Sequence, residues 1–302
     1  MKTVTGIGEA LWDCLPEGRK FGGAPTNFAY HCSQFGLNAW AASAVGDDAL
    51  GKEILDICKN VGLQVICPKV SYETGTVQVT LNKDGIPQYN IKTGVAWDNI
   101  PYSQQLDLLA KQTDAVCWGS LAQRSQVSRS TIHNFIKNMP TDALKVFDIN
   151  LRQDFYSKKI IEESLKLCNI LKINDEELVI VSRMFGLLPE TSKDLEAIWK
   201  NFDFKEACRE ILKEYNLQML ILTCGVNGSY VFTPDEEISQ EETPKVEVAD
   251  TVGAGDSFTA AFVSSILIGK TVKEAHKKAV EVSAYVCTQH GAMPRLPEDI
   301  RR

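Results

Sequence analysis

Residues 250–262, with the sequence DTVGAGDSFTAAF, join a glycine-rich turn and a carboxylate to the start of an apolar helix. The first N–H groups of a helix lack partners within it, and the helix dipole is positive there. Gly253, Ala254 and Gly255 are therefore predicted to hold a phosphate group. Asp256 would repel that phosphate, so we expect it to accept the proton of an attacking hydroxyl group. An ordinary first-turn acid is the alternative for Asp256, but it leaves the glycines unexplained.

A second group of residues suits a sugar. The segment FGGAPTNFA places Gly22 and Gly23 before a predicted helix and Asn27 in its first turns. Glycines let a ligand approach the backbone, and an amide offers both a donor and an acceptor to a hydroxyl group. Asp13, in GEALWD, can accept hydrogen bonds from neighbouring hydroxyls. A plain turn with a cap, and a solvated loop carboxylate, are the respective alternatives.

Two more polar segments follow predicted strands. INDEEL contributes Asn174 and Glu177, and TCGVNGS contributes Thr223, Gly225 and Gly228. Parallel α/β sheets bind ligands at the carboxyl ends of their strands, so both segments are candidate ligand sites. An N-cap at Asn174 explains the first segment equally well, and a hairpin turn into SYVF is the alternative for the second.

The composition predicts a globular, cytoplasmic protein. The 302 residues are 44% hydrophobic and carry a net charge of −7, which argues against general binding of nucleic acid or anionic membranes. We expect no cleaved leader and no membrane span. The nine cysteines include no C-x-x-C pair, and the four histidines have no zinc spacing, so reduced, mostly buried cysteines and no structural metal are expected.

Strands and helices are predicted to alternate, which indicates a mostly parallel sheet. Residues 74–91 interrupt this rhythm with alternating apolar and polar residues around NKDG, and predict an antiparallel hairpin in a separate small sheet. The acidic segment 234–244 is predicted to be a solvated loop. The expected strands are residues 2–8, 39–45, 114–120, 144–150, 169–174 and 218–225, and the expected helices are 24–36, 49–62, 102–112, 129–138, 157–168, 203–216, 255–268 and 272–288.

Two familiar motifs are incomplete. SSILIGKT has Ser264 where a phosphate-binding P-loop needs its first glycine, and we expect Gly269 to end a helix there. GIGEAL lacks the glycine spacing of a dinucleotide fingerprint, so an NAD-linked oxidoreductase loses its main support.

Together, these segments resemble the ribokinase, or PfkB, family of carbohydrate kinases over nearly the whole chain. DTVGAGD resembles the family's D-T-x-G-A-G-D signature, GGAPTNFA and GDDALG resemble its N-terminal signature, and Asn174 with Glu177 matches its N-x-x-E element. The resemblance implies an α/β three-layer sandwich with a mostly parallel central sheet. It further implies a single domain over 1–302, with a β lid formed from segments near 12–20 and 74–95.

The resemblance also implies roles for the candidate residues. Asn174 and Glu177 would organise Mg²⁺ and phosphate through water, and Asp250 with the Val252 carbonyl is the matching place for K⁺. ATP would lie near Thr223, Gly225 and Gly228. The sugar would contact Asp13, Gly22, Gly23 and Asn27.

Within the family, GEALWD, GGAPTNFA, GSLAQRS and DINLR are most similar to fructokinases, which implies a role for Arg152 at the sugar or the transferred phosphate. The expected activity is transfer of the γ-phosphate of ATP to a primary hydroxyl of fructose. Kinases for ribose, 2-keto-3-deoxygluconate or a nucleoside are alternatives, as is a catalytically silent binding regulator, against which the intact Asp256 argues. A homodimer is a candidate assembly.

Asp256 is expected to need no special environment. An unperturbed aspartate has a pKa of about 3.9 and is ionised at neutral pH. Its position is therefore predicted to matter more than its basicity.

Overall fold

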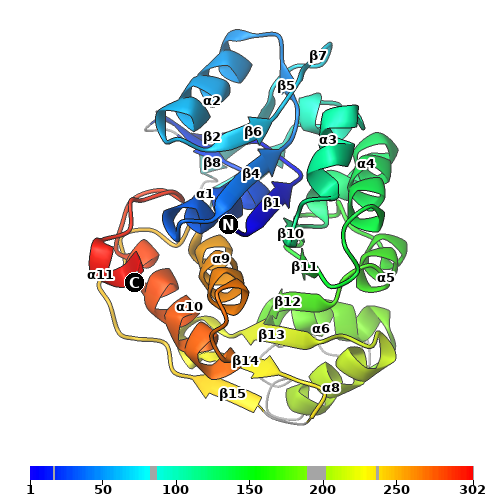
Figure 1. The fold of residues 1–302 in the computed structure, drawn as a ribbon, viewed down its shortest axis with the longest axis vertical. Coiled ribbons are helices and arrows are strands. Elements are labelled where there is room, and N and C mark those ends of the chain that lie inside the picture. The colour runs from blue at the N-terminus through cyan, green and yellow to red at the C-terminus, as the bar shows by residue number, and fades with distance from the viewer. Residues whose placement is uncertain (16–17, 82–86, 189–201, 236–237, 302) are drawn as a thin grey trace.

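The computed structural model describes residues 1–15, 18–81, 87–188, 202–235 and 238–301. Within them, a nine-stranded central sheet forms the middle of the molecule (Figure 1). Its strands in chain order are β1 (Thr3–Ile7), β4 (Asn38–Ala42), β6 (Gln64–Ile66), β10 (Ala115–Trp118), β11 (Leu144–Asp148), β12 (Ile170–Asn174), β13 (Met219–Thr223), β14 (Ser229–Phe232) and β15 (Ile238–Glu241). All neighbouring pairs are parallel except β13–β14 and β14–β15, so the predicted mostly parallel sheet is confirmed.

Helices cover both faces of this sheet (Figure 1). One face carries α1 (Ala24–Gln34), α2 (Ala49–Asn60), α9 (Ala254–Leu267) and α10 (Val272–Cys287). The other carries α3 (Gln104–Ala110), α4 (Gln126–Lys137), α5 (Lys158–Leu165), α6 (Asp175–Met184) and α8 (Phe204–Glu214). Short helices are η1 (Ala96–Asn99), η2 (Leu121–Arg124), η3 (Gly225–Asn227) and α11 (Glu298–Arg301). The predicted three-layer sandwich is confirmed.

The central strands are apolar on both faces because both faces are covered. In β10, Val116 and Trp118 join the apolar cluster on the α3–α8 side, whereas Ala115 and Cys117 join the cluster on the α1–α10 side. Successive side chains of a strand point to opposite faces, so one short apolar run supplies both layers of the core.

The order of the strands creates a site at one edge of the sheet. The chain runs from β1 outward to β4 and β6, returns to β10 on the other side of β1, and then continues outward to β13. Right-handed crossovers place the helices of the two halves on opposite faces. The carboxyl ends of β1 and β10 therefore form a topological switch point, which is where open α/β sheets bind ligands.

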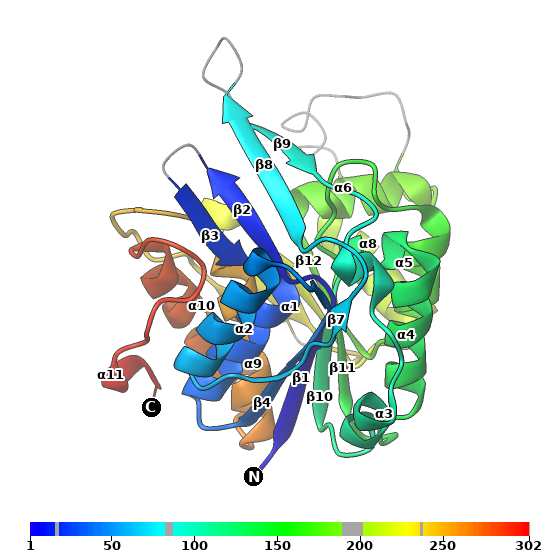
Figure 2. The same cartoon turned by 90° about the horizontal axis from the view of Figure 1, so that it is seen from above.

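A small four-stranded sheet projects beyond this edge (Figure 2). Its strands are β2 (Leu11–Leu15), β3 (Gly18–Gly22), β8 (Gly75–Leu81) and β9 (Pro87–Ile91), in the order β3-β2-β8-β9. Because β8 and β9 are antiparallel, the predicted hairpin over 74–91 is confirmed. Its NKDG turn lies outside the described residues. β5 (Val45–Gly46) and β7 (Lys69–Val70) form a separate parallel pair.

The loop prediction for residues 234–244 is wrong at Ile238–Glu241, which form the edge strand β15. This strand pairs antiparallel with β14. His276 of α10 joins the two strands, since its ring nitrogens lie 2.7 Å from Ser229 Oγ and 2.9 Å from Ser239 Oγ. Residues 238–241 form a strand because they pair with β14 and because Ser239 contacts His276 of α10. The composition of the segment indicates neither of these distant contacts.

Two further predictions, on the cysteines and on the helix end at Gly269, are confirmed. All nine cysteines are free, and six are buried. α9 ends just before Gly269, whose φ of +88° is typical of a helix terminus. Among the described residues, no helix has both the length and the apolar character to cross a membrane, and no cluster of three His, Cys, Asp or Glu side chains could hold a metal.

Candidate active site

The turn that begins α9 requires glycine at its first position. Gly253 is the N-cap, with φ +81°, and a Cβ there would come within 2.7 Å of the Ala292 backbone. Ala254 N already donates a 3.3 Å hydrogen bond to Thr251 O, whereas no backbone acceptor among the described residues takes the N–H of Gly253 or Gly255. No side chain caps this helix. Its first N–H groups thus remain available to an anion.

Asp256, in the first turn of α9, has an environment that the sequence did not reveal. Part of the residue is accessible, but protein surrounds its carboxyl group. Desolvation, followed by the nearby charge of Asp148, raises the pKa of Asp256 to about 7, while Asn27, Lys172 and Arg152 oppose the rise. The expectation of an ordinary pKa is therefore wrong, because burial and a like charge act on this carboxyl group.

Asn27 and Asp256 meet although 229 positions separate them. Asn27 Nδ2 donates a 2.8 Å hydrogen bond to Asp256 Oδ2. Asn27 Oδ1 is buried without a partner among the described residues and so remains free to accept from a ligand. A small cavity beside Asp256 is also lined by Pro25, Phe28 and Trp118. The predicted sugar-binding amide and the predicted base are therefore in direct contact.

Asp13 lies on β2 and faces Lys20 of β3 in the cross-strand register. Desolvation raises the pKa of Asp13 to about 6, and the charges of Arg152 and Lys20 oppose the rise. Gly22 allows close approach, since a Cβ there would be 2.7 Å from Asp13 Oδ2. Gly23 has φ +121°, and its Cβ would lie 2.3 Å from Glu9 O. These contacts place the three candidate residues Asp13, Gly22 and Gly23 where the small sheet meets α1.

Arg152 is exposed, and its Nη1 donates a 2.9 Å hydrogen bond to Leu151 O. Its positive charge opposes the rise in the pKa of both Asp13 and Asp256 that desolvation causes. Such an effect requires the guanidinium to lie within electrostatic range of both carboxylates. Arg152 therefore lies within electrostatic range of both Asp13, the predicted sugar-binding residue, and Asp256, the predicted base.

Asn174 and Glu177 form a complete capping box at the start of α6. Asn174 Oδ1 accepts from Glu177 N at 2.8 Å, and Glu177 Oε2 accepts from Asn174 N at 3.0 Å. Glu177 Oε1 also accepts from Leu151 N at 2.9 Å. Asn174 therefore does cap α6, as the alternative interpretation of this segment predicted. Each carboxylate oxygen retains a lone pair, so the arrangement fits a hydrated Mg²⁺ held through water.

Thr223, Gly225 and Gly228 lie at the carboxyl end of β13. Gly225 begins η3 and Gly228 has φ +93°, so the chain turns back into β14. The hairpin turn considered as the alternative is therefore present, and it lies at the edge where ligands bind. Thr243 Oγ1 donates a hydrogen bond to Gly225 O and holds the following loop against this turn.

Asp250 organises the approach to α9. Its Oδ1 accepts from Val252 N at 3.0 Å, and its Oδ2 accepts from Gly291 N at 3.1 Å. Lys20 Nζ lies 3.3 Å from the same Oδ2. A cation thus already stands at the place where the sequence predicts K⁺, and it belongs to the small sheet.

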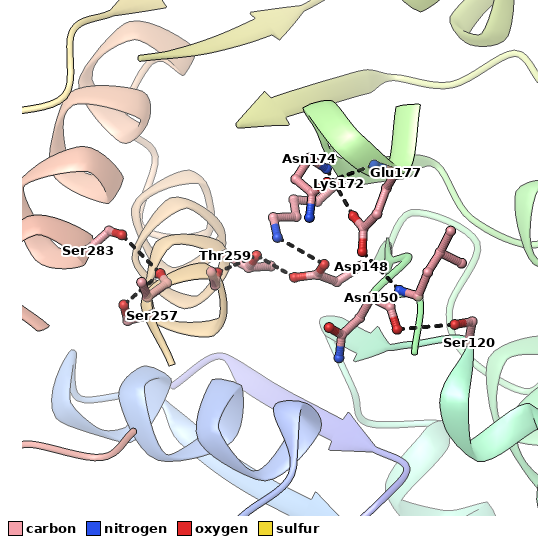
Figure 3. Close-up of polar contacts among 12 residues, drawn as sticks. Ser120, Asp148, Asn150, Lys172, Asn174, Glu177, Ser257, Thr259 and Ser283 are labelled. Atoms are coloured by element: carbon pink, nitrogen blue, oxygen red, sulfur yellow. Dashed lines mark hydrogen bonds and ion pairs between the residues drawn. The ribbon is translucent and has the colours of Figure 1, made fainter. Parts of the chain in front are cut away.

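Lys172, Asp148 and Thr259 form a buried polar cluster that was not predicted from the sequence (Figure 3). Lys172 Nζ of β12 lies 3.1 Å from Asp148 Oδ1 at the end of β11. Thr259 Oγ1 of α9 donates a 2.9 Å hydrogen bond to Asp148 Oδ2. Desolvation disfavours the charge of Lys172, but nearby carboxylates, Asp148 foremost, outweigh it and raise its pKa. The signal was a charged residue inside each apolar strand, in ILKIN and KVFDIN.

This arrangement defines a class of protein. A helix N-terminus open to an anion, a carboxylate poised to take a proton and a polar pocket under a small sheet fit transfer of a phosphoryl group to a hydroxyl of a small molecule. Comparison with known proteins agrees. Residues 17–299 match the model of the pfkB family carbohydrate kinases, and the chain belongs to this family. It is a sugar kinase, a phosphotransferase with an alcohol acceptor.

Its relatives include proteins named for two different substrates. The ATP-dependent 6-phosphofructokinase of Thermoanaerobacterium thermosaccharolyticum is 28% identical over 95% of this chain and 85% of that protein. Probable fructokinase-2 of Arabidopsis thaliana is 28% identical over 98% of this chain and 93% of that protein. A fructokinase of Xylella fastidiosa, solved with bound ATP, has a TM-score of 0.81 at 19% identity and covers 98% of this chain and 95% of that one. This last likeness confirms the fold.

Proposed function

We propose that this protein transfers the γ-phosphate of ATP to a primary hydroxyl of fructose. The hydrogen bond between Asn27 and Asp256 is the observation that carries the proposal, because it brings a candidate sugar-binding amide and a candidate proton acceptor into direct contact. Relatives named fructokinase support the choice of sugar.

In this proposal, Asp13 and Asn27 orient the sugar so that its hydroxyl faces Asp256. The hydroxyl oxygen attacks the γ-phosphorus, and a new O–P bond forms. The bond from the γ-phosphorus to the bridging oxygen breaks, and its electron pair leaves with ADP. Asp256 takes the hydroxyl proton, for which a pKa of about 7 suits a base working near neutral pH.

The chain's own groups stabilise charge during this transfer. The N–H groups of Gly253 and Gly255 face the transferred phosphoryl group, and Ala254 is the less available of the three predicted donors because it already donates to Thr251. Asn174 and Glu177 would hold Mg²⁺ through water, and the bound ion would supply positive charge to the phosphate oxygens. We place ATP along Thr223, Gly225 and Gly228, and treat the small sheet as a lid over the sugar.

We also propose that K⁺ binds beside Asp250 and the Val252 carbonyl. The carboxylate of Asp250 and the Val252 carbonyl supply the oxygen ligands, and the Lys20 ammonium group on Asp250 Oδ2 would compete with K⁺ for this place. In this place K⁺ acts indirectly, by holding the turn before Gly253 in the shape that aims its N–H groups.

Fructose 6-phosphate is a second candidate substrate. The 28% identical 6-phosphofructokinase suggests it, and Lys20 and Arg152 supply positive charge at the mouth of the pocket. Rates of ADP release in the presence of fructose, fructose 6-phosphate, ribose, glucose, 2-keto-3-deoxygluconate and adenosine test both candidates. We expect fructose to have the highest kcat/KM, by up to about 10⁴-fold over analogues that leave buried polar groups unpaired. A higher kcat/KM for ribose, adenosine or fructose 6-phosphate would overturn the fructose assignment.

A further inference from the structure

Lys172 is a charged residue in the interior of a central strand. It is the third residue of β12, between Leu171 and Ile173, which are fully buried, and only 7% of its own surface is exposed. An ammonium group has three N–H bonds, and among the described residues Asp148 is the one partner that lies within ion-pair distance. Two N–H bonds therefore remain for another acceptor.

The position of Lys172 relative to α9 indicates which acceptor its two remaining N–H bonds can reach. A Cβ built on Gly255 would lie 3.0 Å from Lys172 Nζ. The ammonium group thus lies directly beside the turn proposed to hold the transferred phosphoryl group. Asp148, Glu177 and Asp256 all interact electrostatically with the Lys172 ammonium group, and Arg152 also acts on Asp256.

A contribution to stability does not by itself explain the buried ion pair between Lys172 and Asp148. Buried ion pairs are costly to desolvate and can often be replaced by apolar residues without loss of stability. Here Asp148 is held from a second side by Thr259 of α9, one helical turn beyond Asp256. The network therefore fixes Lys172 relative to the first turn of α9, as a charge used in catalysis requires.

We propose that Lys172 is a catalytic residue that donates a hydrogen bond to the transferred phosphoryl group beside Gly255, and that Asp148 and Thr259 are positioning residues that hold it there. The inference rests on the proposed phosphoryl transfer. During that step, negative charge spreads over the oxygens of the γ-phosphoryl group as the bond to ADP breaks and the bond to the sugar oxygen forms. Lys172 stabilises this charge without giving up its proton, and Asp256 alone takes the proton of the hydroxyl.

The competing explanation is that Lys172 only neutralises Asp148. A double-mutant comparison separates the two, because in Asp148→Asn no carboxylate remains for Lys172 to neutralise at that position. We would measure kcat for wild type, Asp148→Asn, Lys172→Met and Lys172→Met/Asp148→Asn. Methionine keeps an unbranched stem and removes the charge, and the double variant leaves no unpaired buried charge from this pair. Lys166→Met, at an exposed lysine paired with Glu162 on α5, is the matched control.

We expect Lys172→Met to lower kcat by about 10²- to 10³-fold in the wild-type background, as loss of one donor to a developing anion does. In the Asp148→Asn background, where Lys172 keeps its charge but loses the group that positions it, we expect a smaller loss of about tenfold or more. Binding of ADP with aluminium fluoride and sugar, which mimics the transferred phosphoryl group, should weaken by a similar factor, while sugar binding alone is unchanged. If Lys172→Met changes kcat less than about threefold in the Asp148→Asn background, Lys172 is only a counter-ion and the proposal fails. The wild-type rate on each sugar is a separate readout, so failure of the fructose assignment leaves this comparison valid on whichever sugar is phosphorylated.

Discussion

Lys20 Nζ, on strand β3 of the small sheet, lies 3.3 Å from Asp250 Oδ2, in the turn that leads to Gly253. The same β3 residue lies opposite Asp13 in the sheet. Lys20 therefore belongs to the small sheet, lies opposite Asp13, the proposed sugar-binding residue, and contacts the turn proposed to bind phosphate. Closure of the small sheet over a sugar would be transmitted to that turn through this ion pair.

Lys20→Met should make the enzyme more dependent on K⁺, because the chain's own cation at Asp250 is lost. A partly exposed ion pair contributes little, so we expect K⁺ to raise the rate of the variant about two- to fivefold more than that of wild type. Rates in potassium, sodium and tetramethylammonium chloride measure this. Arg19→Met is the control, since Arg19 pairs with Glu53 on α2. Equal rates in all three salts for both proteins would remove the K⁺ proposal and leave Asp250 as a turn residue.

Asp256→Asn should lower kcat by about 10²- to 10⁴-fold, because the amide is nearly isosteric and cannot accept the proton. The binding constants of sugar and ATP should change little. Steady-state kinetics with separate binding measurements test both parts. Glu206→Gln replaces an exposed first-turn acid of α8 and should leave kcat unchanged. A near-normal kcat in folded Asp256→Asn would favour the alternative of a first-turn acid.

The pH dependence of kcat/KM should show an acidic limb with an apparent pKa near 7. Below this value Asp256 is protonated and cannot act as a base, so the rate should fall about tenfold per pH unit. The residual activity of Asp256→Asn provides the control, since titration of ATP persists in it while the limb due to Asp256 disappears. A limb near pH 4 in the wild type would contradict the desolvated environment described here.

The same pKa shift predicts a change in stability. The pKa of Asp256 is about 3.9 in the unfolded chain and about 7 in the folded protein, so the folded state binds more protons between these values. Stability from this group is therefore present at pH 4 and lost as the pH rises through 7. We expect the Tm of Asp256→Asn relative to wild type to increase from pH 4 to pH 8. A constant difference across this range would argue against the shift.

Gly255→Ala should impair use of ATP more than binding of sugar. The added Cβ would lie 3.0 Å from Lys172 Nζ, which is buried and held by Asp148, so the turn or the ammonium group must shift. A displacement of this order at a reacting group can cost about 10²-fold in kcat/KM for ATP. Isothermal titration with fructose is the internal control, because Asp13 and Asn27 are untouched. A parallel loss of sugar affinity would indicate general disruption of the pocket.

Interactions between near neighbours in the chain could be predicted from the sequence. The capping box of Asn174 and Glu177 spans three residues, so its spacing alone indicates the helix start that the structure has. The sharp turn at Gly253 and the hairpin formed by β8 and β9 follow from equally local patterns. The alternation of predicted strands and helices likewise indicated a mostly parallel sheet, which binds ligands at the carboxyl ends of its strands.

Only the tertiary structure decided which of these local elements meet and how their charges act on one another. Asn27 reaches Asp256 because α1 packs beside α9, and Lys172 reaches Asp148 because β11 and β12 are neighbours in the sheet. The same packing removes water from Asp256 and places Asp148 close to it, which shifts its pKa by a cause absent from its own segment. The physical reason is range: capping and strand alternation depend on residues a few positions apart, whereas desolvation and charge coupling depend on distances that only the folded chain sets.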